Sequence, residues 1–260
     1  MYIFELAYPG TWLDAMDRDK AWQANNLLML IESQFTEAAV ALNLFEVTRS
    51  AGRPRTRPER EGDGLAVRDM TLLGNSVGMQ QDLTGSEQFE RTWYAAQVAF
   101  KRGKWEAGNW PSQYIRCQVF MYAKCFVYSI DSISKLITEL SKEPGVPPAV
   151  SQQRDVLNTL IPALRDVRDS AHHVEDRGRG LDRKKQPLKL KPVDNGVVRV
   201  PDGGALLLNC LNGNRFGCTT ADGQYGEVEV SAACLSGVRQ CIQAIIDSFT
   251  WMGPPRHYPD

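Results

Sequence analysis

The feature that most constrains the fold of this chain is a stretch from Asp17 to Thr48 that contains neither proline nor glycine. Apolar residues recur along it at three- and four-residue steps, which is the spacing of one face of an α-helix. The residues of that face are Leu27, Leu28, Leu30, Ile31, Phe35, Ala38, Leu42 and Phe45. The pattern predicts one long amphipathic helix, whose apolar face needs other elements to cover it.

Two further helical segments follow the same spacing. A second long helix is predicted from Gln113 to Ser141, because Pro111 opens the segment and Pro144 closes it. Another helix is predicted from Ser151, a suitable N-cap residue, and its apolar positions continue toward Arg177. Pro162 lies inside this helix and should bend it.

The region between the two long helices is less regular. The segment from Gly52 to Gly64 has no apolar residue to bury, so it predicts a loop. Glycines interrupt the following residues, and only Glu87 to Arg102 predicts an uninterrupted helix.

The C-terminal part has a different pattern. Short β-rich runs are separated by Asn212-Gly213 and Asp222-Gly223, which are favoured in hairpin turns. A closing helix is predicted from Ala232 to Phe249, with Ser231 as its N-cap. We therefore predict a mainly α fold: a bundle of four to five helices over residues 1–192, followed over residues 193–260 by a small antiparallel β meander and the closing helix.

The composition fits a globular protein rather than a disordered or fibrous one. With 260 residues, 43% of them apolar, the chain can bury a sizeable core, and its net charge of −1 gives no global attraction to nucleic acid. The most apolar run, Val119 to Ile130, is too short to span a bilayer, so we expect no membrane association. Six cysteines without a C-x-x-C pair favour reduced thiols, and we expect a cytoplasmic protein.

The candidate functional site is the segment from Arg165 to Arg177, which holds two of the three histidines. Residues three, four and seven apart share one face of a helix. The expected stripe consists of Arg165, Arg168, Asp169 and His172, with His173 at its flank. An imidazole exchanges a proton near neutral pH and a guanidinium binds phosphate oxygens through two donors. This combination suits RNA cleavage by its own 2′-hydroxyl, with Asp169 orienting a histidine or holding the arginine.

No metal or other cofactor is expected at this segment. His172 and His173 are neighbours in the sequence. On a helix their side chains point about 100° apart, unlike the pair of ligands at i and i+4 that typically binds zinc.

The same residues carry a resemblance to a known family. Arg168-Asp169-Ser-Ala-His172-His173 fits an Arg-x4-His pattern with an acidic residue directly after the arginine, at the polar end of an amphipathic helix. In this, the helical part from Asp17 to Arg177 resembles the HEPN (higher eukaryotes and prokaryotes nucleotide-binding) superfamily. Arg168, Asp169 and His173 are the best match to its motif, and Arg165 with His172 is a second register.

The resemblance implies a function and partners. It implies a metal-independent endoribonuclease or RNA-binding protein of bacterial defence or toxin type, whose arginine and histidine form one site at a homodimer interface. RNA is then the expected substrate, and an antitoxin or a defence protein is the expected protein partner. The C-terminal meander and closing helix are not part of the family's core bundle.

Two neighbouring features bear on this site. Asp131 interrupts an apolar stretch of the second long helix, so it either is exposed or needs a cationic partner, for which Arg165 or Arg168 could serve. The run from Arg177 to Pro192 holds seven basic residues against Asp182 alone, a local charge of +6. Its expected RNA-binding residues are Arg177, Arg183, Lys184 and Lys185.

Two alternatives remain open at this stage. The charged stripe is also compatible with an ordinary solvated helix face that is stabilised by ion pairs between residues four apart. The fold could also be a helical module that binds nucleotide or a protein without catalysing a reaction. If the site lies on the surface, replacing Arg168 or His173 by alanine should change stability by no more than about 1 kcal/mol.

Overall fold

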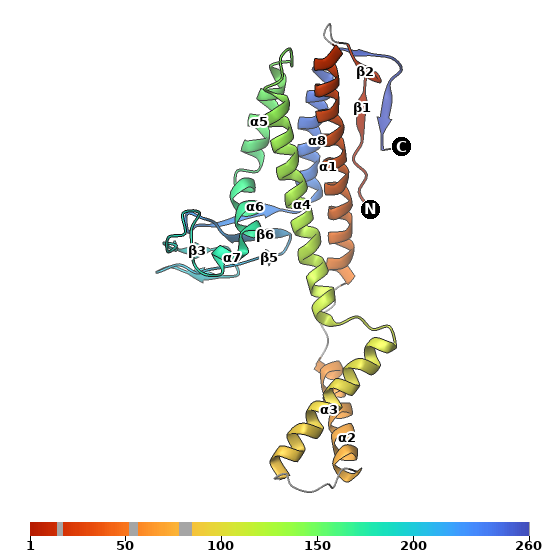
Figure 1. Cartoon of the computed structure of the whole chain (residues 1–260), viewed down its shortest axis with the longest axis vertical. Helices are drawn as coiled ribbons and strands as arrows, with labels where there is room; N and C mark the ends of the chain where they lie inside the picture. The colour runs from red at the N-terminus through yellow and green to blue at the C-terminus, as the bar shows by residue number, and fades with distance from the viewer. Residues whose placement is uncertain (15–17, 52–56, 78–84, 260) are drawn as a thin grey trace. The chain divides into compact units, whose positions relative to one another are not determined.

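The computed structural model of the chain describes residues 1–14, 18–51, 57–77 and 85–259 (Figure 1). It is mainly α-helical with small antiparallel sheets in the C-terminal part, which confirms the predicted fold class. The chain divides into two compact units: unit 1 comprises residues 1–47 and 119–260, and unit 2 comprises residues 48–118.

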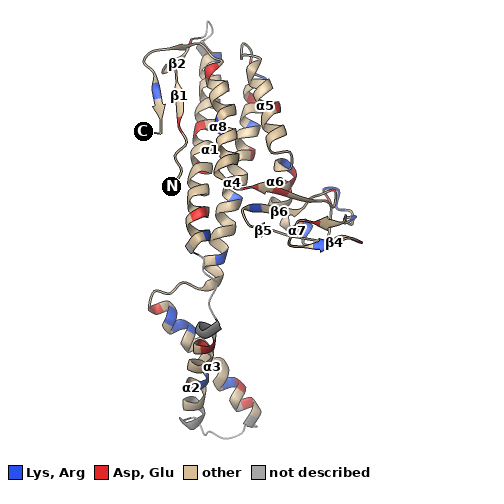
Figure 2. Ribbon diagram, turned by 180° about the vertical axis from the view of Figure 1, so that it is seen from behind, with Lys and Arg blue, Asp and Glu red and all other residues tan. Residues whose placement is uncertain are grey.

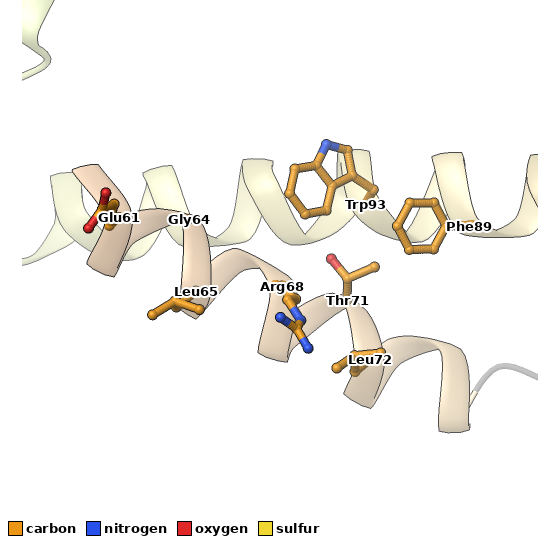
Figure 3. Close-up of a pocket in the computed structure, with 8 residues that line it drawn as sticks. All are labelled: Glu61, Gly64, Leu65, Arg68, Thr71, Leu72, Phe89 and Trp93. Carbon is orange, nitrogen blue, oxygen red and sulfur yellow. The ribbon is translucent and has the colours of Figure 1, made fainter. Parts of the chain in front are cut away.

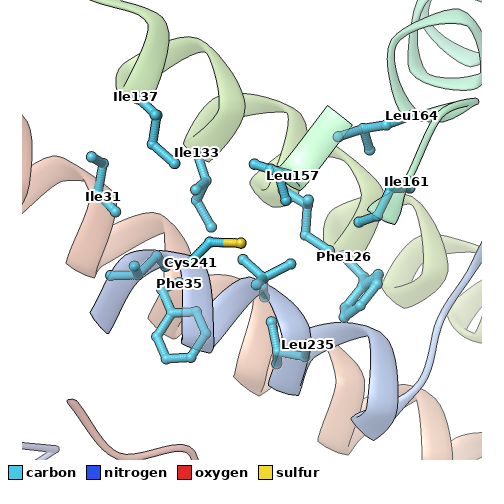
Figure 4. Close-up of a cluster of buried hydrophobic side chains, with 14 of the residues drawn as sticks. Ile31, Phe35, Phe126, Ile133, Ile137, Leu157, Ile161, Leu164, Leu235 and Cys241 are labelled. Atoms are coloured by element: carbon cyan, nitrogen blue, oxygen red, sulfur yellow. The ribbon is translucent and has the colours of Figure 1, made fainter. Parts of the chain in front are cut away.

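Unit 1 is built on helices that enclose a continuous apolar core. They are α1 (Arg18–Ala51), α4 (Ser112–Leu140), α5 (Ala149–Leu160), α6 (Leu164–His172), α7 (Val174–Arg177) and α8 (Ala232–Asp247). The two long helices predicted from apolar spacing correspond to α1 and α4. Figure 4 shows side chains of α1, α4, α5, α6 and α8 meeting in this core, among them Phe35, Phe126 and Leu235, each fully buried.

The predicted helix from Ser151 to Arg177 is instead three helices. Pro162 ends α5 rather than bending it, and Ile161 has non-helical backbone angles of φ −133° and ψ 70°. A second break falls at His173, with φ −96° and ψ 46°. Ser151 is not the N-cap, because α5 begins at Ala149 and the Ser151 hydroxyl donates to the Pro148 carbonyl at 2.8 Å.

The predicted meander is present and lies against α6. Strands β5 (Cys210–Asn212), β6 (Arg215–Thr219) and β7 (Tyr225–Glu229) pair in sequence order, and both α6 and the meander contribute to one core. Gly213 and Gly223 have positive φ angles of 62° and 83° in the connecting turns. Phe216 and Val228 face each other across β6 and β7 and are both buried. A separate pair, β3 (Val193–Asp194) and β4 (Arg199–Val200), precedes them.

Both ends of the chain pair with each other. Strand β1 (Leu6–Tyr8) is antiparallel to β9 (Arg256–Tyr258), and β2 (Trp12–Leu13) is antiparallel to β8 (Trp251–Met252). The closing helix α8 packs against α5 and β1, and its N-cap Ser231 accepts from the Cys234 amide at 3.1 Å, as predicted.

The predicted domain boundary after residue 192 does not coincide with the division observed. The reason is that α8 and the meander complete the apolar core of unit 1 instead of forming an appendage.

Unit 2 contains α2 (Arg57–Val77) and α3 (Gly85–Glu106), which pack along one another. The predicted loop from Gly52 to Gly64 is wrong where it is described, since residues 57–64 form the first turns of α2. Residues 52–56 of that prediction lie outside the described part. The predicted helix from Glu87 to Arg102 corresponds to α3.

Within the described residues, one helix is long and apolar enough to cross a membrane when length and composition alone are considered, namely Asp19–Ser50. In its most apolar window 33% of the helix is buried within the protein, and both core helices of soluble proteins and signal sequences near an N-terminus meet the same criteria.

Candidate functional site

Helix α6 positions most of the candidate residues because one side of it is anchored in the core. Leu164, Val167, Ser170 and Ala171 are buried, so the intervening polar residues point away from that contact. Val167 lies close to the meander, where its carbonyl accepts from the buried Cys218 thiol at 3.4 Å. The polar side of α6 is therefore held in place by both the bundle and the sheet.

Arg168 joins α6 to α4 through a buried carboxylate. Its Nε lies 2.8 Å from Oδ2 of Asp131, whose side chain is only 7% exposed, and Lys135 Nζ lies 2.7 Å from the same oxygen. Nε is buried without an aligned hydrogen bond, so the contact is a close ion pair rather than a well-directed hydrogen bond. Of the two alternatives for Asp131, burial beside a cationic partner is the one that holds.

Asp169 connects the arginine and the histidine of the first register. Its Oδ1 lies 4.0 Å from Arg168 Nη1 and 3.9 Å from His173 Nε2, while Oδ2 accepts from Arg183 Nε at 2.7 Å. Partial burial raises the pKa of the Asp169 carboxyl, but the hydrogen bond and charge of Arg183, followed by the charges of His173 and Arg168, outweigh it. The pKa is lowered overall, so the group is a carboxylate at neutral pH.

The two histidines have different surroundings. His173 sits at the break between α6 and α7, its side chain is 47% exposed, and its Nδ1 lies 3.4 Å from Glu175 Oε1. His172 turns its ring toward Tyr128 of α4, with ring centroids 6.3 Å apart in an edge-on arrangement. The helix break means that His173 does not continue the predicted helical stripe.

The structure therefore brings the residues of the first register together around Asp169 and shows no contact between Arg165 and His172 of the second. Asp169 links Arg168 with His173, whereas Arg165 is exposed and forms no ion pair with any described residue. Residues of the first register lie around one carboxylate oxygen, so a side chain of the type that exchanges protons lies near one of the type that binds phosphate.

Arg183 belongs to the basic run of residues 177–192 and contacts the polar side of α6. Besides its bond to Asp169, its Nη2 donates to Asp166 Oδ1 at 2.9 Å. The hydrogen bond with Asp169 raises the pKa of the guanidinium despite its partial burial. We call the two contacts of Arg183, with Asp169 and with Asp166, the Arg183 bridge. The side chain expected to bind RNA phosphate is occupied by two carboxylates of α6.

Arg177 is buried and does not face RNA. Its side chain is the largest of those that are fully buried, with 1% exposure, and its Nε donates to the Ser170 hydroxyl at 3.2 Å. A second donor bonds the Leu181 carbonyl. The prediction of Arg177 as an RNA-binding residue is wrong, because the residue joins α7 to α6 and to the following loop.

Most other charges of the basic run are also paired within the chain. Asp176, which is buried, binds Arg179 at 2.7 Å and also Lys185, and both hydrogen bonds lower the pKa of its carboxyl. Lys191 lies 3.6 Å from Asp222. Figure 2 shows acidic and basic residues interspersed around α6 and α7.

The local charge of +6 is therefore largely offset by carboxylates from outside the run. Among the described residues, Lys184 has no ion pair, so its charge remains available to an anionic ligand.

One group of donors could geometrically hold a metal ion. Ligand atoms of His173, Glu175 and Asp176 lie within 4.8 Å of one another. Arg179 and Lys185 already contact the Asp176 carboxylate, so a cation placed there would face two positive charges. We assign no metal to this group.

One residue of the site, Tyr128, and the contacts of a second, Arg183, were not predicted from the sequence. Tyr128 lies beside His172, and burial raises the pKa of its hydroxyl although the charge of Arg168 opposes the shift. Tyr128 precedes Asp131 by one helical turn on α4, so their shared face was a usable signal. The Arg183 bridge spans more than a dozen residues, and no local pattern predicts it.

Comparisons of the chain with models of known protein families, with curated proteins and with solved structures gave no match.

Proposed function

We propose that this protein is a HEPN-like, metal-independent endoribonuclease that acts as a homodimer. The observation that supports this most directly is the position of Asp169 Oδ1, 4.0 Å from a guanidinium nitrogen of Arg168 and 3.9 Å from an imidazole nitrogen of His173. The three side chains match, residue by residue, the best register of the motif.

The proposed reaction is cleavage of RNA by its own 2′-hydroxyl. The 2′-oxygen loses its proton to a base and attacks the adjacent phosphorus, and the bond from phosphorus to the 5′-oxygen breaks as that oxygen receives a proton. His173 is exposed and can take up or donate a proton, and Arg168 stabilises the negative charge that develops on the phosphorane. The products are a 2′,3′-cyclic phosphate and a 5′-hydroxyl.

A second copy supplies what one chain lacks. The base and the acid act on opposite sides of the phosphorus, and one imidazole cannot reach both in the same step. Two copies of α6 facing each other would bring two His173 side chains and two Arg168 side chains to one phosphate. We propose that RNA is the substrate, that the protein acts in the cytoplasm, and that an antitoxin or defence protein is its partner.

The Arg183 bridge shapes how RNA would bind. A phosphate near His173 would compete with Asp169 and Asp166 for the Arg183 guanidinium. Arg183 would then move from carboxylates to phosphate on binding, while Lys184 needs no such exchange. We expect Lys184→Ala to weaken RNA binding and to lower the slope of log affinity against log salt concentration by about one unit.

The proposed activity is tested by cleavage of a single-stranded RNA with purified protein in EDTA. His173→Ala should lower the cleavage rate about 100-fold or more, because a general acid–base group is lost. His172→Ala is the matched control, since it removes the neighbouring imidazole and should retain activity. Loss with His172→Ala alone would move the site to the Arg165 register, and a requirement for added metal would contradict the mechanism.

Alanine alone is not a sufficient test substitution for Arg168, because it changes stability as well as chemistry. Because its guanidinium lies beside buried Asp131, Arg168→Ala should cost about 1–3 kcal/mol of stability, not the smaller effect of a surface residue. The double variant Asp131→Asn with Arg168→Gln removes both charges together. We expect it to fold more stably than Arg168→Ala and to remain inactive, which separates loss of chemistry from loss of structure.

A second candidate function is a non-catalytic helical module. It is favoured by the pairing of the basic run, since the Arg183 bridge and Asp176 neutralise much of the charge that would attract RNA. A purified protein that neither cleaves RNA nor binds it in any buffer tested would support this alternative.

A further inference from the structure

Helices α4 and α6 run antiparallel along one line of contact, which two pairs of residues define. Arg168 of α6 lies beside Asp131 of α4. One turn later on α6, His172 lies beside Tyr128, which is one turn earlier on α4. Figure 1 shows the two helices next to each other. The two contacts fix which turns of each helix share one strip of surface.

Basic residues continue this strip on the adjacent turns. On α6, Arg165 is exposed one turn before the arginine of the contact. On α4, Lys124 and Lys135 lie one turn beyond the contact at either end. We call this strip the α4–α6 seam. Its residues are Lys124, Tyr128, Asp131 and Lys135 of α4 and Arg165 and Arg168 of α6.

The position of Lys124 follows from its effect on a buried thiol. Burial raises the pKa of Cys218 to about 12, and the charges of Arg177 and Lys124 oppose the shift. The same thiol donates to the carbonyl of Val167 on α6 at 3.4 Å. Lys124 therefore lies on the side of α4 that faces α6.

The seam has an excess of positive charge. Asp131 is its one carboxylate, and Arg168 and Lys135 both lie against the same oxygen of it. Neither Lys124 nor Arg165 forms an ion pair with any residue that the structure describes. Four cations and one carboxylate give a local charge of +3.

The acidic residues of α6 beside the seam do not cancel this charge. Asp166 and Asp169 are both bound by Arg183 in the Arg183 bridge. Most charges of the basic run are likewise paired within the chain. The seam therefore holds charge that is not neutralised, directly beside the candidate site.

The Arg168 guanidinium also has unfilled hydrogen-bond donors. Its side chain is 19% exposed, and no described residue accepts a well-directed hydrogen bond from it. Nε is buried without an aligned acceptor, and Nη1 lies 4.0 Å from Asp169. Donors that are withdrawn from water without acceptors are costly, and a phosphate supplies two acceptor oxygens in the geometry of a guanidinium.

Tyr128 adds a neutral donor in the middle of the seam. Within the described part of the chain, its hydroxyl has no hydrogen-bond partner. Burial raises the pKa of this hydroxyl, although the charge of Arg168 opposes the shift. The group is therefore protonated at neutral pH and can donate to an oxygen bound near Arg168.

The apolar groove of unit 2 offers no comparable set of groups. It has a volume of about 620 Å³ and lies between α2 and α3 (Figure 3). Its lining includes Leu65, Leu72, Phe89 and Trp93, and Arg68 is its single cation. An anionic ligand is therefore better matched by the seam.

We propose that the α4–α6 seam is the surface that binds the RNA substrate as a single strand. Arg168 binds the phosphate that is cleaved, and Arg165 and Lys124 bind phosphates on either side of it. On α4 the seam is about 16 Å long from Lys124 to Lys135. A single line of contacts matches one backbone rather than the two of a duplex. This proposal deepens the proposed function and rests on it, since it takes RNA as the substrate.

The test measures binding separately from cleavage in the full-length protein. The probe is a single-stranded RNA with methylated 2′-hydroxyls, which keeps its phosphates but cannot be cleaved by its own 2′-oxygen. Lys124→Ala and Arg165→Ala should each lower the slope of log affinity against log salt concentration by about one unit, and the double variant by about two. Arg199→Ala is the matched control, since it removes an exposed arginine of β4 outside the seam and should leave the slope unchanged.

Tyr128→Phe distinguishes a hydrogen bond from a charge. It should raise the dissociation constant of the methylated RNA about threefold to tenfold, because one hydrogen bond to the ligand is lost. The salt slope should stay that of the wild type, since no charge is removed. Chemical denaturation with an unchanged midpoint shows that each variant is folded.

Three results would overturn the proposal. The first is a wild-type protein that does not bind the methylated RNA at low salt. The second is a double variant whose affinity and salt slope equal those of the wild type, even if unmodified RNA is cleaved. The third is polyglutamate that competes as well as RNA at equal charge, which would make the seam a docking surface for an acidic protein.

Failure of the nuclease proposal gives a different result. Unmodified RNA would then stay intact, while the methylated RNA would still bind with a salt slope that depends on Lys124 and Arg165. That outcome supports the seam as the RNA-binding surface and contradicts only the cleavage.

Discussion

Units 1 and 2 of this chain are both helical, but they differ in how much apolar surface each buries for itself. In unit 1, residues of five helices and of the meander form one continuous core, with Phe126, Ile130 and Phe216 fully buried. In unit 2, among the side chains of α2 and α3 whose burial is described, three are buried: Val67, Thr71 and Ala96. Helix formation alone does not create a core, because a hairpin has only one internal interface and each helix has an apolar face wider than that contact.

Because the two units differ in their cores, the residues exposed on each differ in character. In unit 1 the exposed groups at α6 are polar and are held in position by a rigid core, as a reactive site requires. In unit 2 the exposed groups are largely apolar, which is typical of a surface that another protein covers. The following predictions test this contrast, from the largest expected effect to the smallest.

The largest effect should come from a cavity in the core of unit 1. Phe126→Ala removes a fully buried ring of α4 and should lower the free energy of unfolding by about 3–5 kcal/mol. The matched change in unit 2 is Phe89→Ala, where the ring is half exposed, and it should cost no more than about 1 kcal/mol. Chemical denaturation followed by circular dichroism measures both. Equal losses would contradict the contrast between the units.

Replacement of the buried Arg177 should have the next largest effect. Arg177→Ala leaves a cavity and an unpaired Leu181 carbonyl, so we expect a loss of about 2–4 kcal/mol. Arg177→Met retains most of the volume without burying a charge, and it should be the more stable of the two variants. The same denaturation experiment compares them. A surface role for Arg177 is supported only if the alanine variant matches the wild type.

A change in the small core of unit 2 should act locally. Val67→Ala removes one of the few buried side chains of α2 and should cost about 1 kcal/mol or less. Amide hydrogen exchange should become faster in α2 and α3 and remain unchanged in α8, because the units have separate cores. Slower or faster exchange in α8 would show that the units are energetically coupled.

The smallest expected effect is the loss of the stability contributed by the Asp169 carboxylate at low pH. The pKa of Asp169 lies below its ordinary value of 3.8 in the folded state, so its contribution to stability is present above that pH. The contribution is lost as the pH falls through the lowered pKa. Because Asp169 is partly solvated, we expect it to be worth about 0.5–1 kcal/mol. Asp169→Asn should be less stable than the wild type at pH 7, and the difference should disappear in acid. A difference that is constant with pH would show that the Arg183 bridge does not act through this carboxylate.

Local sequence patterns correctly predicted the elements that depend on helix periodicity, capping residues and turn residues. Periodic apolar residues located α1 and α4, Ser231 located the start of α8, and Asn212-Gly213 and Asp222-Gly223 located the turns of the meander. The Arg168–Asp131 pair was among the predicted alternatives, because a carboxylate in an apolar helix face demands a cation. Each of these inferences depends on residues within a few turns of one another or on a single strong energetic requirement.

Other features depend on contacts between distant segments. The sequence alone determined that the chain is mainly helical, that a meander and a capped helix follow, and that arginine, aspartate and histidine gather near residue 170. Only the tertiary structure decided that Arg177 is buried, that the Arg183 bridge neutralises part of the basic run, and that α8 belongs to the core. The physical reason is that charge and apolarity are properties of a residue, whereas burial and ion pairing depend on which remote segments the packed core brings beside it.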